Sequence, residues 1–270
     1  MTTASDIEVD NYLPTLAGIR HELRGGRNVY EGYQRGWGLE YGDLKSHILA
    51  DRDYQYAKSV AESRSVVSLE RFMNLFLLVK FFLPRLPFGH IVEYGSFRGG
   101  SAMFMAVLAE RFLPGTNVYA LDTFDGMPET DRAIDAHSAG DFADTNIAEI
   151  QATVDKAGLG NIRFVKGLFA DTAPTLLPKV GSIILAHIDC DIYSAVKYSY
   201  EASKPYMVPM GYYVFDDATA SSCIGATEAV ESFVIARDGL LSEQIYPHFV
   251  FRHRGLTKAS MPEENIQSRR

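Results

Sequence analysis

Three aspartates stand where two apolar segments end, and together they could bind a metal ion. Asp189 closes the run that starts at Ser182, and Asp216 and Asp217 close the run that starts at Gly211. In an open α/β sheet the carboxyl ends of parallel strands line one crevice, and neighbouring strands lie about 5 Å apart. Carboxylates this close cannot all stay ionised without a cation. The pattern predicts a Mg²⁺ site, because hard oxygen ligands suit that ion; the alternative is a set of helix N-caps and turn aspartates.

Two side chains beside the first aspartate could take a proton from a substrate. A metal at this edge would bind an acceptor hydroxyl and lower its pKa, so that a general base could remove the proton. Asp191 is the preferred base. His187 stands two residues before Asp189 and shares its face of the strand, so it is the rival base or simply a satisfied buried histidine.

A glycine-rich turn within residues 91–101 predicts a nucleotide-like cofactor. Glycine allows close approach of the backbone to a ligand, and the start of the following helix leaves N–H groups unpaired. Gly95, Gly99 and Gly100 do not form the G-x-G-x-x-G pattern of dinucleotide sites. Glu93 would repel a pyrophosphate, but it could hold a cationic amino-acid group through water or backbone. The turn therefore favours S-adenosylmethionine over NAD.

The ends of the next two strands supply further candidate contacts to this cofactor. Asp122 would accept hydrogen bonds from the ribose hydroxyls, or it is a turn or N-cap aspartate. Phe169 would lie at the adenine, or it belongs to the core. The expected cofactor-binding residues are Glu93, Gly95, Ser96, Gly99, Ser101, Asp122, Thr123, Phe124, Gly167, Phe169 and Asp189.

Alternating helices and strands must position these residues, and the apolar pattern predicts them from about residue 67. Helices are expected over about 67–84, 101–115 and 145–158, and strands over 91–94, 117–122, 162–167, 182–189 and 211–216. Apolar strands joined by helices predict a parallel sheet covered on both faces. Segments 243–246 and 249–253 predict an antiparallel hairpin at one edge. The expected fold class is therefore α/β, with a doubly wound, mostly parallel seven-stranded sheet.

Composition excludes several classes of protein. The chain has 270 residues and a net charge of −8, which argues against a nucleic-acid partner. Cys190 and Cys223 are too few for a disulfide framework, so a reducing compartment is expected. The polar N-terminus does not fit a signal peptide, and the apolar run 72–88 falls short of a bilayer span. We expect a cytoplasmic protein with no membrane partner.

The motifs resemble those of the macrocin O-methyltransferase family over roughly residues 68–254. The resemblance is carried by Ser68-Leu-Glu-Arg-Phe-Met-Asn74, the Glu93 turn with Phe97-Arg98-Gly99-Gly100, Asp122-Thr-Phe-Asp-Gly-Met-Pro128, Gly167-Leu-Phe-Ala-Asp-Thr172, Asp189-Cys-Asp191-Ile-Tyr193 and Asp216-Asp217. The family implies a class I methyltransferase fold that uses S-adenosylmethionine and Mg²⁺ to methylate sugar hydroxyls on antibiotics. It implies metal ligands at Asp189, Asp216 and Asp217 and a base at Asp191. Within it, a calicheamicin-type deoxysugar acceptor is the narrower expectation.

The expected organisation has three parts. Residues 1–60 would form a lid or oligomerisation segment, 61–257 a Rossmann-like methyltransferase domain, and 258–270 a disordered tail. The expected function is Mg-assisted methyl transfer to a glycosylated small molecule, by a homo-oligomer. Two rivals stay open, a catechol-type O-methyltransferase and a non-catalytic S-adenosylmethionine-binding protein. Ile192, in place of a lysine three residues after Asp189, counts slightly against the first.

Overall fold

The computed structural model describes residues 43–61, 63–220 and 222–254. Contacts divide the chain into two compact units, 1–45 and 46–270, and the site described below lies wholly in the second. Most of the expected lid or oligomerisation segment and the expected tail fall outside the described residues. No helix in the described ranges is long and apolar enough to cross a bilayer.

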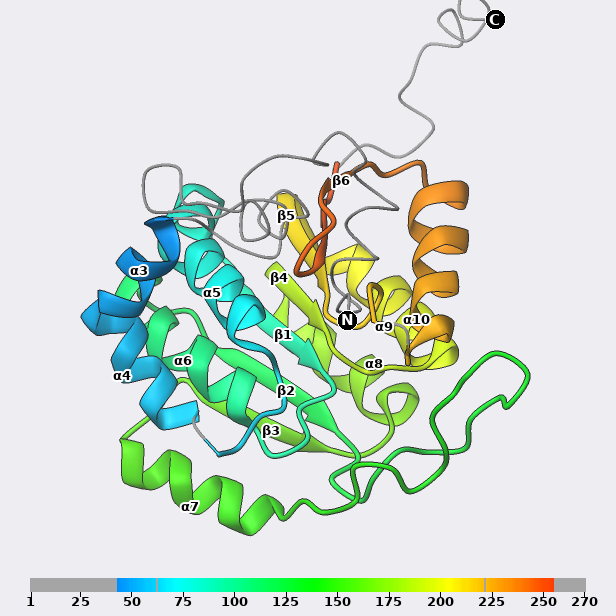
Figure 1. Ribbon diagram of the computed structural model, residues 1–270, viewed down its shortest axis with the longest axis horizontal. Helices are drawn as coiled ribbons and strands as arrows, with labels where there is room; N and C mark the ends of the chain where they lie inside the picture. The colour runs from blue at the N-terminus through cyan, green and yellow to red at the C-terminus, as the bar shows by residue number, and fades with distance from the viewer. Residues whose placement is uncertain (1–42, 62, 221, 255–270) are drawn as a thin grey trace, which may run out of the picture. The chain divides into compact units, whose positions relative to one another are not determined.

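A seven-stranded sheet forms the centre of the second unit, in the order β3-β2-β1-β4-β5-β7-β6 (Figure 1). Its strands are β1 (His90–Tyr94), β2 (Val118–Asp122), β3 (Ile162–Lys166), β4 (Ile183–Ile188), β5 (Met207–Phe215), β6 (Ser242–Gln244) and β7 (Phe249–Arg252). The first five run parallel, while β7 is antiparallel to β5 and β6 is antiparallel to β7. The predicted parallel sheet and its antiparallel edge hairpin are both confirmed.

Helices cover both faces of this sheet, as a doubly wound fold requires. They are α3 (Asp43–Ala50), α4 (Arg52–Ala61), α5 (Leu69–Leu77), α6 (Gly100–Phe112), α7 (Ile147–Ala157), α8 (Phe169–Val180), α9 (Tyr193–Ser203) and α10 (Ile224–Ala229). Helices α4, α5 and α6 lie on one face, and α8, α9 and α10 lie on the other (Figure 1). Strand β4 is buried along its whole length between these layers, which explains why it is apolar at every position except His187.

Helix α4 belongs to the packed core, although all but its last residue lies within the first sixty positions. Tyr54 is buried, and its ring meets Phe76 at 5.4 Å and Phe104 at 5.8 Å between centroids, both edge to face. Such contacts add to the stabilisation that the buried area provides. This helix therefore supports α5 and α6, and α6 begins directly after the glycine-rich turn.

The helix predicted over 67–84 is shorter than expected. Ser68 caps α5, since its side chain accepts a hydrogen bond from the Arg71 N–H. After Leu77 the chain continues as a π-helical turn, Leu78–Phe82, and a 3-10 turn, Leu83–Arg85. Pro84 has no N–H with which to continue the helical hydrogen bonds. The well-formed helix thus covers the part of the segment that reaches the candidate site.

Candidate active site

The turn after β1 lies directly against the end of β4. Gly95 has a φ of +85°, and a Cβ at this position would lie 1.6 Å from the Asp189 carbonyl oxygen. No residue other than glycine fits such an approach. The predicted cofactor turn and the first predicted metal ligand are therefore brought together by backbone contact.

Asp122 organises this turn through its side chain. Its Oδ2 accepts hydrogen bonds from the N–H groups of Ser96 and Phe97, both at 2.8 Å, and its Oδ1 accepts from the Phe124 N–H at 2.7 Å. The amides that a pyrophosphate would need are thus already paired with a carboxylate. This arrangement supports the choice against a dinucleotide, and contact of Asp122 with a ribose stays a prediction.

A pocket opens between this turn, the end of β4 and the end of β5. Seven of the predicted cofactor residues line it: Gly95, Ser96, Ser101, Asp122, Thr123, Phe169 and Asp189. Among the residues that the structure describes, the buried Ser96 hydroxyl has no hydrogen-bond partner, so it is a candidate contact for a ligand.

Four predicted cofactor residues lie outside the pocket lining, namely Glu93, Gly99, Phe124 and Gly167. Gly99 precedes α6 with a φ of +79°. A Cβ on it would come within 2.9 Å of Ile150 and 3.0 Å of Phe164, so packing accounts for this glycine. Phe124 is buried.

Glu93 and His187 form a buried pair behind the pocket. The two residues face each other in the register of β1 and β4, and Glu93 Oε1 lies 2.9 Å from His187 Nδ1. Burial lowers the pKa of His187, but its interactions with Asp216 and Glu93 raise it more, to about 9. Because His187 is wholly buried between two carboxylates, it does not reach the pocket as a base would. The geometry favours Asp191 for that role.

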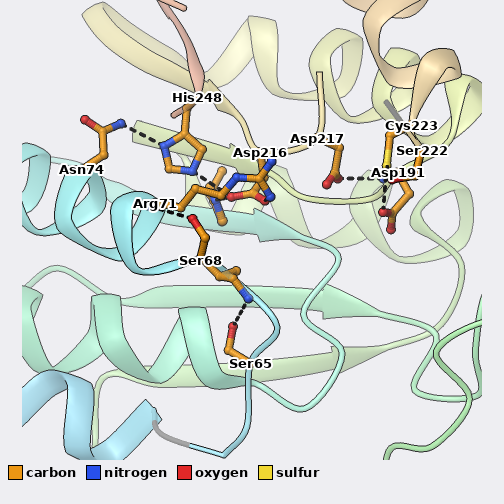
Figure 2. Close-up of polar contacts among 12 residues, drawn as sticks. Ser65, Ser68, Arg71, Asn74, Asp191, Asp216, Asp217, Ser222, Cys223 and His248 are labelled. Carbon is orange, nitrogen blue, oxygen red and sulfur yellow. Dashed lines mark hydrogen bonds and ion pairs between the residues drawn. The ribbon is translucent and has the colours of Figure 1, made fainter. Parts of the chain in front are cut away.

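Asp216 is held from two sides by side chains that the motif analysis did not assign to the site. His248 Nε2 lies 2.7 Å from its Oδ1, and Arg71 forms an ion pair with its Oδ2 (Figure 2). The Asn74 amide lies 2.8 Å from His248 Nδ1. If the amide donates there, His248 carries its proton on Nε2 and donates it to Asp216. Burial would raise the pKa of Asp216, but the two histidines hold it well below its usual range.

The three predicted metal ligands converge. One carboxylate oxygen from each of Asp189, Asp216 and Asp217 lies within 4.8 Å of the other two. Burial and the neighbouring carboxylates raise the pKa values of Asp189 and Asp217 well above the usual range. A set of crowded, oxygen-only donors fits a hard divalent cation such as Mg²⁺, which would relieve this repulsion.

Asp191 lies beside this cluster and lines the same pocket. Its backbone has a φ of +59°, and its N–H donates to Asp217 Oδ2 at 3.0 Å. Its Oδ1 lies 3.4 Å from the Cys223 sulfur and 3.6 Å from His137 Nε2. Burial raises the pKa of Asp191, although His137 acts against that shift.

Sequence reasoning missed five residues around these carboxylates: Arg71, Asn74, His137, Cys223 and His248. A signal existed for two of them, because Arg71 and Asn74 stand three apart in the motif after Ser68 and so share one face of α5. Nothing local marked the others.

Comparison with known proteins gives a family match. The macrocin O-methyltransferase (TylF) family matches residues 62–239. A Streptomyces olivaceus protein, 8-demethyl-8-(2,3-dimethoxy-alpha-L-rhamnosyl)-tetracenomycin-C 4'-O-methyltransferase, is 30% identical over 60% of this chain and 65% of its own length. Mycinamicin III 3''-O-methyltransferase of Micromonospora griseorubida is 26% identical over 63% of this chain and 70% of its own. The chain thus spans slightly less than two thirds of the first relative.

Solved structures show the same fold. The O-methyltransferase NovP superposes with a TM-score of 0.60 at 22% identity, over 78% of this chain and 94% of its own. The calicheamicin methyltransferase CalS11 gives a TM-score of 0.57 at 18% identity, over 93% of this chain and 94% of its own. The predicted class I methyltransferase fold is confirmed.

Proposed function

Because the chain belongs to the macrocin O-methyltransferase family, we propose that it transfers a methyl group from S-adenosylmethionine to a sugar hydroxyl of a glycosylated natural product. The observation that carries the proposal is the convergence of Asp189, Asp216 and Asp217 at one pocket with the glycine-rich turn. The names of the relatives support a sugar acceptor, since one of them refers to a rhamnosyl tetracenomycin.

The cofactor would occupy the part of the pocket between Ser96 and Phe169. S-adenosylmethionine supplies an electrophilic methyl group when it is bound. The Ser96 hydroxyl, which has no partner within the described ranges, offers a hydrogen bond, and Asp122 holds the turn by accepting from three backbone N–H groups. Phe169 packs edge to face on Tyr94 at 5.3 Å, which fixes its ring beside the pocket for contact with the adenine.

The three converging aspartates would hold Mg²⁺. The ion, when bound, lowers the pKa of a coordinated hydroxyl. Arg71 and His248 fix the orientation of the Asp216 carboxylate. Asp191 then accepts the proton of the acceptor hydroxyl, and burial raises its pKa, which is the direction that makes a carboxylate a stronger base. Alignment of the hydroxyl oxygen with the methyl group supplies the remaining rate acceleration.

Calorimetric titration with S-adenosylhomocysteine tests the cofactor assignment, with Mg²⁺ or chelator present and NAD⁺ as the control ligand. We expect binding of S-adenosylhomocysteine that is largely indifferent to the metal, and none of NAD⁺. A preference for NAD⁺ would overturn the assignment.

Turnover of glycosylated acceptors by the Asp189→Asn variant tests the metal mechanism. We expect turnover to fall by about 100-fold or more while affinity for S-adenosylhomocysteine is retained, because the substitution removes a ligand charge without filling the pocket. Unchanged activity in this variant would refute the metal assignment. Methylation of simple catechols in preference to glycosides would refute the sugar acceptor.

A further inference from the structure

Three side chains with different donor atoms meet next to the pocket, outside the three-aspartate cluster. Cys223 Sγ lies 3.4 Å from Asp191 Oδ1 and 3.6 Å from His137 Nε2. The distance between Asp191 Oδ1 and His137 Nε2 is also 3.6 Å. Asp191 extends from the end of β4, His137 from the loop after β2, and Cys223 immediately precedes α10. Figure 2 shows Asp191 and Cys223 turned toward each other.

These separations match the edges of a zinc tetrahedron. With Zn–S near 2.3 Å and Zn–N and Zn–O near 2.0 Å, neighbouring donor atoms lie about 3.3–3.6 Å apart. The side chains would need to move little to bind the ion. A thiolate and an imidazole favour Zn²⁺ over Mg²⁺, which prefers oxygen donors.

A further carboxylate prepares the histidine as a ligand. Asp141 Oδ2 lies 3.1 Å from His137 Nδ1 and also accepts the Ser138 N–H at 3.0 Å. With its proton on Nδ1, directed at Asp141, the imidazole presents a lone pair on Nε2 toward Cys223 and Asp191. The same carboxylate–histidine arrangement supports metal ligands in zinc proteins.

We propose that His137, Asp191 and Cys223 form a second cation site, which binds Zn²⁺ through three protein ligands and leaves a fourth position open. Binding replaces the thiol proton of Cys223, which passes to the buffer, so that the sulfur binds as thiolate. Zn²⁺ here would also inhibit methyl transfer, since Asp191 becomes a ligand and no longer accepts a proton. This consequence rests on the proposed function, whereas the binding itself does not.

The binding test uses the full-length protein without cofactor or acceptor. Co²⁺ replaces Zn²⁺ as a spectroscopic probe, with Mg²⁺ in excess to occupy the three-aspartate cluster. We expect a sulfur-to-cobalt charge-transfer band and the intense visible bands of four-coordinate Co²⁺, both removed by one equivalent of Zn²⁺. A spectrum without sulfur ligation, or one typical of octahedral coordination, would overturn the proposal.

Substitutions assign the ligands. Cys223→Ser should remove the charge-transfer band and weaken Zn²⁺ binding by about 100-fold or more, and Asp141→Asn should weaken it by about 10–100-fold. Cys190→Ser is the matched control, because Cys190 is the other buried cysteine and lies against Ser199. If Cys223→Ser does not fold, His137→Gln tests the same site from a loop position, where the side chain is 20% exposed. Equal Zn²⁺ affinity in wild type and in whichever of these two variants folds would refute the site.

The inhibition test separates this inference from the proposed function. Zn²⁺ is titrated into the methyl-transfer assay at saturating Mg²⁺, with wild type and the Cys190→Ser control. Spectroscopic binding with inhibition at the same Zn²⁺ concentration supports both statements. Binding by a protein that shows no methyl transfer overturns the proposed function but leaves the site standing. Full activity with the site occupied overturns the inhibitory role.

Discussion

Replacing Asn74 by leucine should lower the free energy of unfolding, because His248 Nδ1 loses its hydrogen-bond partner. Both residues are buried, with 4% of Asn74 and 0% of His248 exposed, and 2.8 Å separates the amide nitrogen from Nδ1. Leucine keeps the branched shape and suits a helix interior, so the main loss is the hydrogen bond. In the variant, His248 Nδ1 loses its hydrogen-bond partner and cannot reach solvent.

The magnitude follows from the cost of an unsatisfied buried acceptor, about 1–3 kcal/mol. For a domain of this size, that corresponds to a fall in Tm of about 2–12 °C. The substitution should also weaken activation by Mg²⁺ by about 10–100-fold, because His248 holds Asp216 Oδ1 and would be free to turn away from it.

Urea unfolding of four proteins measures the effect as a double-mutant cycle: wild type, Asn74→Leu, His248→Phe and the double variant. If the cost arises at His248 Nδ1, Asn74→Leu should destabilise the wild type by about 1–3 kcal/mol and the His248→Phe background by less than about 0.5 kcal/mol. Equal costs in the two backgrounds would show that the hydrogen-bond argument is wrong.

Two further predictions concern the glycine-rich turn and the loss of folding stability at low pH. Gly95→Ala should cost about 3 kcal/mol or more in urea unfolding and abolish S-adenosylhomocysteine binding, since its Cβ would meet the Asp189 carbonyl oxygen at 1.6 Å. Gly158→Ala, also at positive φ but with nothing within 4 Å, should cost only about 1–2 kcal/mol; equal losses would contradict the steric argument. Burial raises the pKa of Asp238, but hydrogen bonds from Arg237, Lys204 and Tyr200 lower it more, to about 2. Because this pKa is depressed, the stabilisation is present above the ordinary value near pH 4 and is lost as pH falls toward 2. Asp238→Asn should thus cost about 1 kcal/mol near pH 7, after allowance for solvent screening, and a gap in urea midpoint that did not shrink in acid would refute this assignment.

The arrangement of strands and the converging aspartates could be predicted from the sequence. The central strands β1 and β4 are largely buried on both faces, which favours apolar residues locally, whereas the edge strand β3 also carries the exposed Arg163 and Lys166. Asp189, Asp216 and Asp217 follow two apolar runs directly. Once the strands are parallel neighbours, their carboxyl ends must meet at one edge, so the cluster follows from topology alone.

The partners of those aspartates were decided only by the tertiary structure. Arg71 is 145 positions from Asp216, and Asn74 is 174 positions from His248. His248 reaches the site because β7 pairs with β5 in antiparallel register. Glu93 looked like a cofactor residue in its turn, yet strand pairing sets it opposite His187 inside the protein. Local sequence sets which segments become strands and turns, while hydrogen bonds between distant residues depend on how those strands and helices pack.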